Sequence, residues 1–124
     1  MKRVYSLKGR KSYNSVFLNG RRNRGKGVVI FVLRRSKSGK SDNQSDIRDV
    51  KLGISVSKKL GKAYRRNWIK RRIRTVCYGL IEQMNDGLSI IIKPGPKSME
   101  MSYEELRNDI TGVFKNSGVI NGSG

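Results

Sequence analysis

One segment, residues 58–84, constrains the fold of this chain more than any other, because a dense run of cations leads directly into an apolar helical stripe. Nine of the seventeen residues from Lys58 to Arg74 are Lys or Arg, and none is Asp or Glu. Apolar residues then recur at the spacing of one helix face, at Ile69, Ile73, Val76, Cys77, Leu80, Ile81 and Met84. The spacing predicts an amphipathic helix whose apolar face packs on a sheet.

The cations of this helix indicate a polyanionic partner. At 100° per residue, Asn67, Arg71 and Arg74 lie together on the face opposite the stripe, with Trp68 at one edge of the stripe and Lys70 at the other. Like charges repel each other, and positive charge near a helix N-terminus opposes the helix dipole by about 0.3–1 kcal/mol per group. A solvated face is the usual fate of a charge run, but here phosphates would cancel the repulsion. We therefore predict a nucleic-acid surface.

The charge of the whole chain supports the same prediction. The formal net charge is +19 over 124 residues, and residues 1–81 hold 24 of the 28 Lys and Arg but only 3 of the 9 Asp and Glu. A globular chain tolerates such self-repulsion most readily beside a polyanion. We expect a single RNA-binding domain over residues 1–124, with a basic arm at 1–9 and a disordered tail at 119–124.

Cysteine and histidine usage excludes several classes of site. The chain has one cysteine, Cys77, and no histidine, so neither an intrachain disulfide nor a zinc site of the usual kind can form. No apolar run resembles a signal peptide or reaches the roughly 20 residues of a membrane span. These features predict a cytoplasmic protein without a membrane partner.

The N-terminal part predicts a short helix and then a strand. Tyr13, Val16 and Phe17 share one helix side over Arg10–Asn19, with Gly20 as a left-handed C-terminal residue. The two aromatic residues are either core or a base-stacking platform. After a basic loop at 21–26, the run 28–33 is apolar throughout and predicts a strand with both faces covered, on which Phe31 could face the same cleft as Phe17.

The remaining elements are predicted from the spacing of apolar residues and from the residues that begin or end each element. Residues 34–49 are rich in Ser, Lys and Asp and predict a flexible hairpin connection, with 35–49 as its loop. Residues 50–57 alternate as a half-buried strand whose other face is small and polar, and 88–93 predict a third strand. Ser102 and Glu105 form a capping box for a last helix that ends at Gly118. The predicted order is α-β-β-α-β-α, an α+β fold in which the general rule makes the strand-helix-strand crossover right-handed.

The residues indicate a binding protein without its own catalytic site. Because the chain has no histidine, the candidates for general acid–base catalysis are carboxylates. These lie in the predicted loop or late in the chain, and no two of them suggest a shared catalytic site. Glycine patterns for phosphate or dinucleotide binding are absent from the sequence. We therefore expect no catalytic residue, cofactor or metal site. Missing zinc ligands and heptads argue against a DNA reader, and aromatic residues near the cations favour RNA with a single-stranded portion over DNA.

Two stretches carry a resemblance to a known family. The run GISVSKKLGKAYRRNWIKRRIR resembles the signature of the bacterial ribonuclease P protein subunit, and LKGRKSYNSVFLNG resembles the opening helix of that family. The resemblance implies a two-layer α+β sandwich with a small central sheet, ribosomal protein S5 domain 2-like, with a left-handed βαβ crossover. It also implies a partner, a catalytic RNA that removes the 5′ leader of precursor tRNA using magnesium ions, which the protein assists.

The resemblance also assigns site residues. It places Arg66, Asn67, Trp68, Lys70, Arg71 and Arg74 against the catalytic RNA, and Tyr13, Phe17, Phe31, Lys58 and Lys59 in or beside a cleft for the precursor-tRNA leader. At Trp68 the family motif usually has arginine. This tryptophan would stack on a base or on a guanidinium, or would instead cap the helix edge against the sheet.

Two other functions remain open at this point. A structural ribosomal RNA-binding protein shares the size, charge and build, but it has no need of a stacking cleft for a mobile strand. An autonomous ribonuclease would cleave RNA without an RNA partner.

Overall fold

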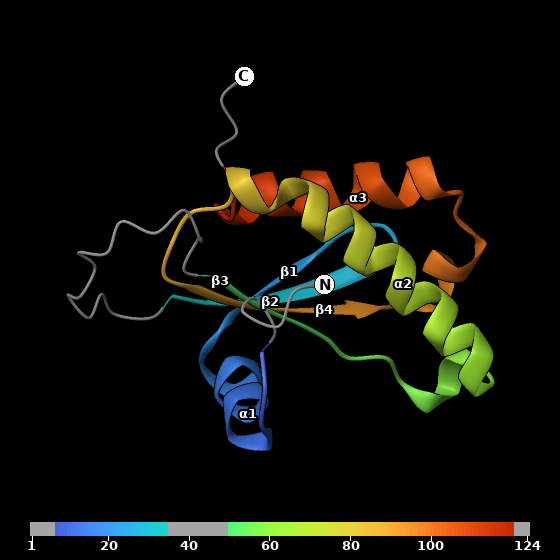
Figure 1. Ribbon diagram of the computed structural model, residues 1–124, viewed down its shortest axis with the longest axis horizontal. Coiled ribbons are helices and arrows are strands. Elements are labelled where there is room, and N and C mark those ends of the chain that lie inside the picture. The colour runs from blue at the N-terminus through green and yellow to red at the C-terminus, as the bar shows by residue number, and fades with distance from the viewer. Residues whose placement is uncertain (1–6, 35–49, 121–124) are drawn as a thin grey trace.

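The computed structural model describes residues 7–34 and 50–120, which form a four-stranded sheet with helices on both faces (Figure 1). The α-helices are α1 (Arg10–Asn19), α2 (Ala63–Leu80) and α3 (Tyr103–Ser117). The strands are β1 (Arg21–Arg24), β2 (Val28–Arg34), β3 (Val50–Ile54) and β4 (Leu88–Pro94). Short 3₁₀ helices are η2 (Lys58–Leu60), η3 (Ile81–Gln83) and η4 (Pro96–Glu100).

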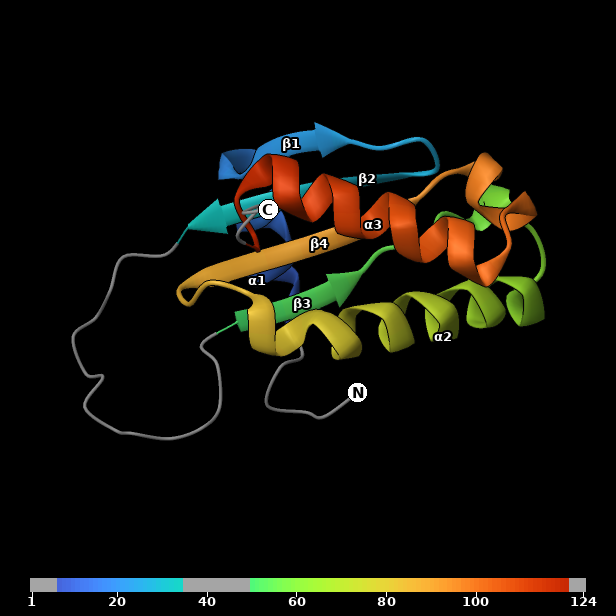
Figure 2. The same ribbon diagram turned by 90° about the horizontal axis from the view of Figure 1, so that it is seen from above.

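The sheet has the order β1-β2-β4-β3, so the strand that comes last in the chain lies inside the sheet. β2 pairs antiparallel with β1 and β4, and β3 pairs parallel with β4. In Figure 2, where α2 and α3 lie nearest the viewer, β4 lies to the left of β3 once both strands are set pointing up. The crossover through α2 is therefore left-handed, and the right-handed expectation from the general rule is wrong for this chain.

The main core lies between the sheet and the pair α2 and α3 (Figure 1). Every residue of the predicted stripe is buried, and Ile69 and Ile73 have no exposed surface, but α2 ends at Leu80, so Ile81 and Met84 lie beyond the helix. From the sheet, Ile30, Leu52 and Ile90 face them as members of the same cluster. Burial of this stripe fastens α2 to the sheet and leaves its cationic side outward, as the sequence predicted.

A smaller apolar cluster holds α1 on the opposite face of the sheet. Its buried members are Leu7, Val16 and Ile91, with Phe17 and Phe31 half-buried against them. The α+β class is confirmed: α2 and α3 make one helical layer on the sheet, and α1 packs on the other side.

The sequence signals for both ends of α3 are confirmed, whereas the left-handed C-terminal residue expected for α1 is not. Ser102 and Glu105 form the complete capping box, and Gly118 is left-handed with φ 83°. Gly20, expected to be left-handed, is extended with φ −80°. The reason for a glycine at this position is steric instead, because a Cβ there would lie 2.5 Å from the backbone oxygen of Val16.

Three boundary predictions need correction. The basic loop at 21–26 contains β1, an edge strand whose polar residues give no apolar alternation but whose backbone pairs with β2. The segment after β2 is not a hairpin connection, because β4 lies between β2 and β3. β3 ends at Ile54, three residues before the predicted end at Ser57. α2 begins at Ala63, within the basic run, and two residues separate it from the end of η2 at Leu60.

The predicted ends of the chain are corrected where the structure describes them. Val119 and Ile120 are buried, and Ile120 forms a β-bridge with Met84, so they belong to the core rather than to a disordered tail. In the basic arm, Leu7 is buried and its N–H donates to the backbone oxygen of Leu52 (2.8 Å). The remaining parts of these predictions, 1–6, 35–49 and 121–124, lie outside the described residues.

Candidate nucleic-acid interface

An aromatic pair marks the sheet face that carries α1. The rings of Phe17 and Phe31 meet edge to face, with centroids 4.9 Å apart and planes at 79°. This geometry is favoured for aromatic pairs. Tyr13 lies over Gly53 of β3, where an added Cβ would stand 2.6 Å from the tyrosine oxygen. The three predicted cleft aromatics are thus brought together, and each remains half-buried.

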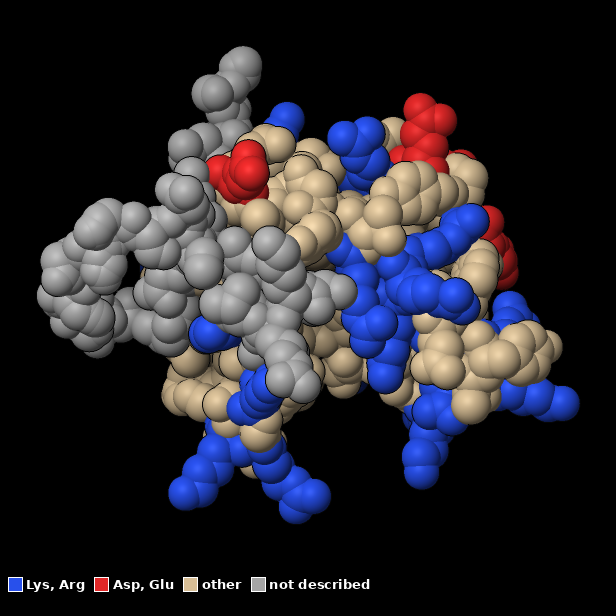
Figure 3. Space-filling model, in the orientation of Figure 1, with Lys and Arg blue, Asp and Glu red and all other residues tan. Residues whose placement is uncertain are grey.

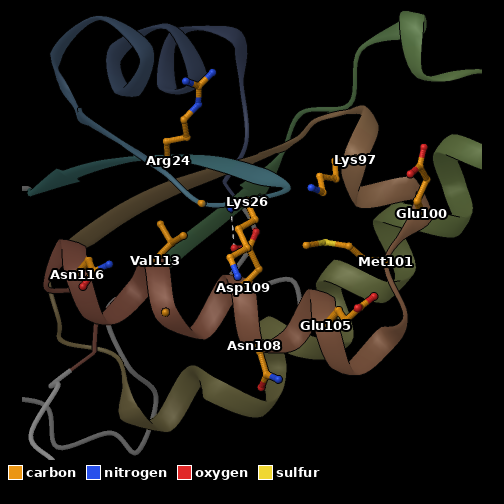
Figure 4. Close-up of a pocket in the computed structure, with 12 residues that line it drawn as sticks. Arg24, Lys26, Lys97, Glu100, Met101, Glu105, Asn108, Asp109, Val113 and Asn116 are labelled. Atoms are coloured by element: carbon orange, nitrogen blue, oxygen red, sulfur yellow. Dashed lines mark hydrogen bonds between the residues drawn. The ribbon is translucent and has the colours of Figure 1, made fainter.

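The strand register places cations beside these rings. Cα partners across the sheet share a face, so Arg22 joins Phe31. One row further along, Arg24 and Lys93 flank Val29 on the same face. All three cations are exposed, and Figure 4 shows Arg24 pointing from β1 towards the side of α1. Sequence reasoning missed this set, because β1 was not recognised as a strand and a face can be assigned only from its register.

The predicted lysines of the cleft mouth lie after β3. Lys58 and Lys59 are exposed on η2, whose start is capped by the Ser57 hydroxyl accepting from the Lys59 N–H. Figure 3 shows the lower outline of the molecule hollowed between the part formed by α1 and the part that carries η2. We use the name α1 cleft for the sheet face beside α1 that carries Tyr13, Phe17 and Phe31.

The second predicted set lies on α2, across the sheet from the α1 cleft. Asn67, Arg71 and Arg74 are exposed, whereas Arg66 and Lys70 are half-buried. The Arg66 Nε donates to the backbone oxygen of Gly61 (3.2 Å), which fixes its side chain at the start of the helix. The outward orientation predicted for Asn67, Arg71 and Arg74 is confirmed, and Lys70 is half-buried in keeping with its predicted place at the edge of the stripe.

Trp68, the position that departs from the family motif, combines two of its predicted roles. Its side chain is half-buried against the main core, and the Arg72 guanidinium carbon stands 4.4 Å from its ring centroid. Arg72 also donates from Nη1 to the backbone oxygen of Met101 (3.3 Å). Trp68 thus both closes the helix edge and stacks on a guanidinium, while a contact of Trp68 with RNA stays a prediction.

Positive charge dominates the surface around α2. From Val50 to Ile81 the chain has no Asp or Glu, and the first turn of α2 has none to offset its cations. Figure 3 shows Lys and Arg gathered over α2 and on the two lower protrusions, with Asp and Glu in the upper part of the molecule. This surface suits a polyanion and costs repulsion without one.

A pocket of about 910 Å³ lies elsewhere, between the β1–β2 turn, η4 and α3 (Figure 4). Its charges are mixed, with Lys26 and Lys97 against Glu100, Glu105 and Asp109. The Asp109 carboxylate is already engaged, because it accepts from the backbone N–H groups of Lys26 (2.7 Å) and Gly27 (2.8 Å). The carboxylate therefore fastens the turn to α3, and the pocket lacks the uniform charge of a phosphate site.

Chemically reactive groups are sparse in the described part of the chain. Burial raises the pKa of the Cys77 thiol to about 12, which keeps it protonated and unreactive. Within residues 7–34 and 50–120, no three carboxylate or thiol side chains group as metal ligands. In the same ranges, no helix has the length and apolarity to cross a membrane.

Fold and surface together define a class: a small, strongly basic α+β protein with an aromatic cleft on one sheet face and a cationic helix on the other. Comparison with known proteins makes the class specific. The family model described as Ribonuclease P matches residues 1–118. The ribonuclease P protein component of a Bacillus cereus strain is 34% identical over 119 residues, covering 96% of both chains. That of Bacillus anthracis is also 34% identical and is covered over 92% of its length.

Solved structures agree with this assignment. The Staphylococcus aureus RNase P protein matches with a TM-score of 0.78 and 27% identity, covering 94% of this chain and 98% of that one. The Thermotoga maritima RNase P protein, at 23% identity and a TM-score of 0.73 over 90% of this chain and 96% of that one, supports the fold alone. The chain belongs to the bacterial ribonuclease P protein family, and is the protein component of that tRNA-processing holoenzyme. Membership implies the RNase P RNA as a partner.

Proposed function

We propose that this protein binds the RNase P RNA through α2 and holds the 5′ leader of precursor tRNA in the α1 cleft. The RNA would then remove the leader with magnesium ions. One observation carries the proposal: the edge-to-face pair of Phe17 and Phe31, on a sheet face that also carries exposed cations. Such a combination of aromatic edges and positive charge suits a single strand, whose bases stack while its phosphates meet cations.

The α2 surface and the α1 cleft would bind different RNAs. The side chains proposed to face the catalytic RNA are Arg66, Asn67, Trp68, Lys70, Arg71 and Arg74, and those proposed for the leader are Tyr13, Phe17, Phe31, Lys58 and Lys59. The α1 cleft and the α2 surface lie on opposite sides of the sheet (Figure 1). The protein can therefore contact the leader and the catalytic RNA at once, and its cations reduce the repulsion between the two RNAs.

The proposal assigns the chemical step to the RNA. The described residues offer no clustered metal ligands, so the magnesium ions are proposed to be held by RNA phosphates. The contribution of the protein is affinity and position, which raise the rate when leader binding helps to bring the cleavage site into place. The compartment proposed is the cytoplasm, in keeping with a buried, reduced Cys77.

Reconstitution with the RNase P RNA of the same source tests the proposal. At low magnesium, adding the protein should stimulate cleavage of precursor tRNA. Phe17→Leu keeps an apolar side chain but removes the ring, and should weaken precursor binding by about 5- to 150-fold while leaving mature tRNA unchanged. Leu18→Ala is the matched control, because Leu18 is adjacent on α1 but 81% exposed.

Two outcomes would contradict this assignment. Equal losses for precursor and mature tRNA would favour a purely structural RNA-binding protein, and cleavage by the protein alone would indicate an autonomous ribonuclease.

A second measurement tests the α2 surface through salt dependence. Arg71→Ala should weaken holoenzyme assembly and reduce the slope of log affinity against log salt by about one. Lys115→Ala, an exposed cation of α3, should leave the slope unchanged. A slope that Arg71→Ala does not alter would remove Arg71 from the phosphate contacts.

A further inference from the structure

Planar side chains form a row along one edge of α2. Tyr64, Trp68 and Arg72 are spaced four residues apart, which makes them neighbours on successive turns. Arg72 lies over Trp68 at 4.4 Å and over Tyr103, from the start of α3, at 5.9 Å. We call these four residues the aromatic row; none of its three aromatic residues belongs to the α1 cleft.

The inner part of the row has a structural explanation. Arg72 lies between two rings and donates to the backbone oxygen of Met101, so it joins α2 to the segment that begins α3. Trp68 packs against the main core. These contacts hold the indole and the guanidinium in a fixed orientation.

Tyr64 is not explained in this way. Its side chain is 70% exposed, and among the described residues no ring or cation–π contact of Tyr64 is found. A single exposed aromatic residue is ordinary. Tyr64, however, stands at the open end of a row of planar groups, in the first turn of α2, beside the exposed cations Lys62 and Arg65.

We propose that Tyr64 and Trp68 form a stacking platform for unpaired bases of the partner RNA, separate from the α1 cleft. A base would stack on the Tyr64 ring, with the indole of Trp68 one turn further along, and the flanking phosphates would meet Lys62 and Arg65. The absence of carboxylates from Val50 to Ile81 favours a nucleic acid over an apolar peptide as the occupant. Preorganisation of Trp68 by Arg72 reduces the entropy lost on binding. The inference rests on the RNA binding proposed above.

The only tryptophan of the chain provides the signal for a test. The full-length protein is titrated with a short oligoadenylate and with an abasic oligomer of the same length, which keeps the phosphates but has no bases. Oligoadenylate should quench the Trp68 fluorescence, and the abasic oligomer should bind by charge with little quenching. To remove the contribution of the α1 cleft, the titration is repeated in a Phe17→Leu background.

Variants of Tyr64 make the test specific. Tyr64→Leu should weaken oligoadenylate binding by about 5- to 150-fold, the range for one stacked base, and leave abasic binding unchanged. Tyr64→Phe should retain the wild-type affinity. Tyr78→Leu is the control, since Tyr78 is an exposed tyrosine of the same helix outside the row.

Each alternative outcome is decisive. Equal oligoadenylate affinity for wild type and Tyr64→Leu would overturn the platform, and so would equal losses for both oligomers, which would indicate a general structural defect. If the platform fails while Phe17→Leu still separates precursor from mature tRNA, the proposed function stands. If neither oligomer binds and the protein does not stimulate the RNase P RNA, the proposed function fails as well.

Discussion

Replacing Gly53 with alanine tests how closely the α1 cleft is built. Gly53 lies in β3 directly beneath Tyr13, so an added Cβ would stand 2.6 Å from the tyrosine oxygen and 2.8 Å from the ring carbon that bears it. Ordinary van der Waals contact begins at 3.4 Å. The ring must therefore move by about 0.8 Å, the difference between 2.6 and 3.4 Å, or leave the cleft.

The size of the effect follows from two opposing contributions. Overpacking a closely fitted site costs about 1–3 kcal/mol. Replacing glycine by alanine in a regular element returns about 0.5–1 kcal/mol. The free energy of unfolding of Gly53→Ala should thus fall by about 1 kcal/mol, and precursor affinity should fall with it because Tyr13 is displaced.

Urea unfolding with matched variants measures the stability effect. Gly79→Ala is the control, because Gly79 is exposed in α2 and an added Cβ there meets nothing within 4 Å. The same substitution should therefore raise the free energy of unfolding by about 0.5–1 kcal/mol at Gly79 and lower it at Gly53. In a Tyr13→Ala background the cost at Gly53 should vanish, since the ring that it displaces is gone.

Two results would refute this reasoning. Gly53→Ala could prove as stabilising as Gly79→Ala, or its cost could be the same with and without the Tyr13 ring. Either result would mean that the close approach of α1 to β3 does not restrict the cleft.

Three further predictions concern two residues outside the interface, Cys77 and Asp109. Cys77 should resist a disulfide reagent at pH 8 until the chain opens, whereas a Cys77→Ala/Thr75→Cys variant should react at once; equal rates would contradict the burial of the thiol. Folding raises the pKa of the Cys77 thiol from 9.0 to about 12. Its contribution to the free energy of unfolding is therefore complete below pH 9 and is lost as the pH rises from 9 towards 12. Asp109→Ala should lower the free energy of unfolding by about 1–3 kcal/mol, since two backbone N–H groups of the β1–β2 turn lose their acceptor. Asn108→Ala, its exposed neighbour, should change thermal unfolding little, and equal shifts for both would argue against the turn contact.

Much of the fold could be predicted because its signals are local. The stripe of α2 and the capping box of α3 each follow from spacing within a few residues. The alternation of strand 28–33 between two faces predicts that Phe31 can lie on the side of Phe17. Such features depend on the period of one element alone.

The rest depends on contacts between distant residues. The polar strand β1 is stabilised by pairing with β2 and has no pattern of its own. The strand order and the crossover hand depend on where β4 inserts. Gly20 and Gly53 are also approached by other segments, at the Val32 backbone and the Tyr13 side chain respectively. The site residues Arg22 and Lys93 could be placed beside the cleft only once the register was known.

The inside position of β4 has a consequence for synthesis of the chain. Among the described strands, β3 pairs only with β4, and β2 reaches β3 only through it. The sheet therefore cannot close on the ribosome until the chain has been made as far as Pro94. By residue 81, 24 of the 28 Lys and Arg have already been added. Most of the positive charge is thus present in the nascent chain before its sheet can close, so the chain carries this charge unfolded during much of its synthesis.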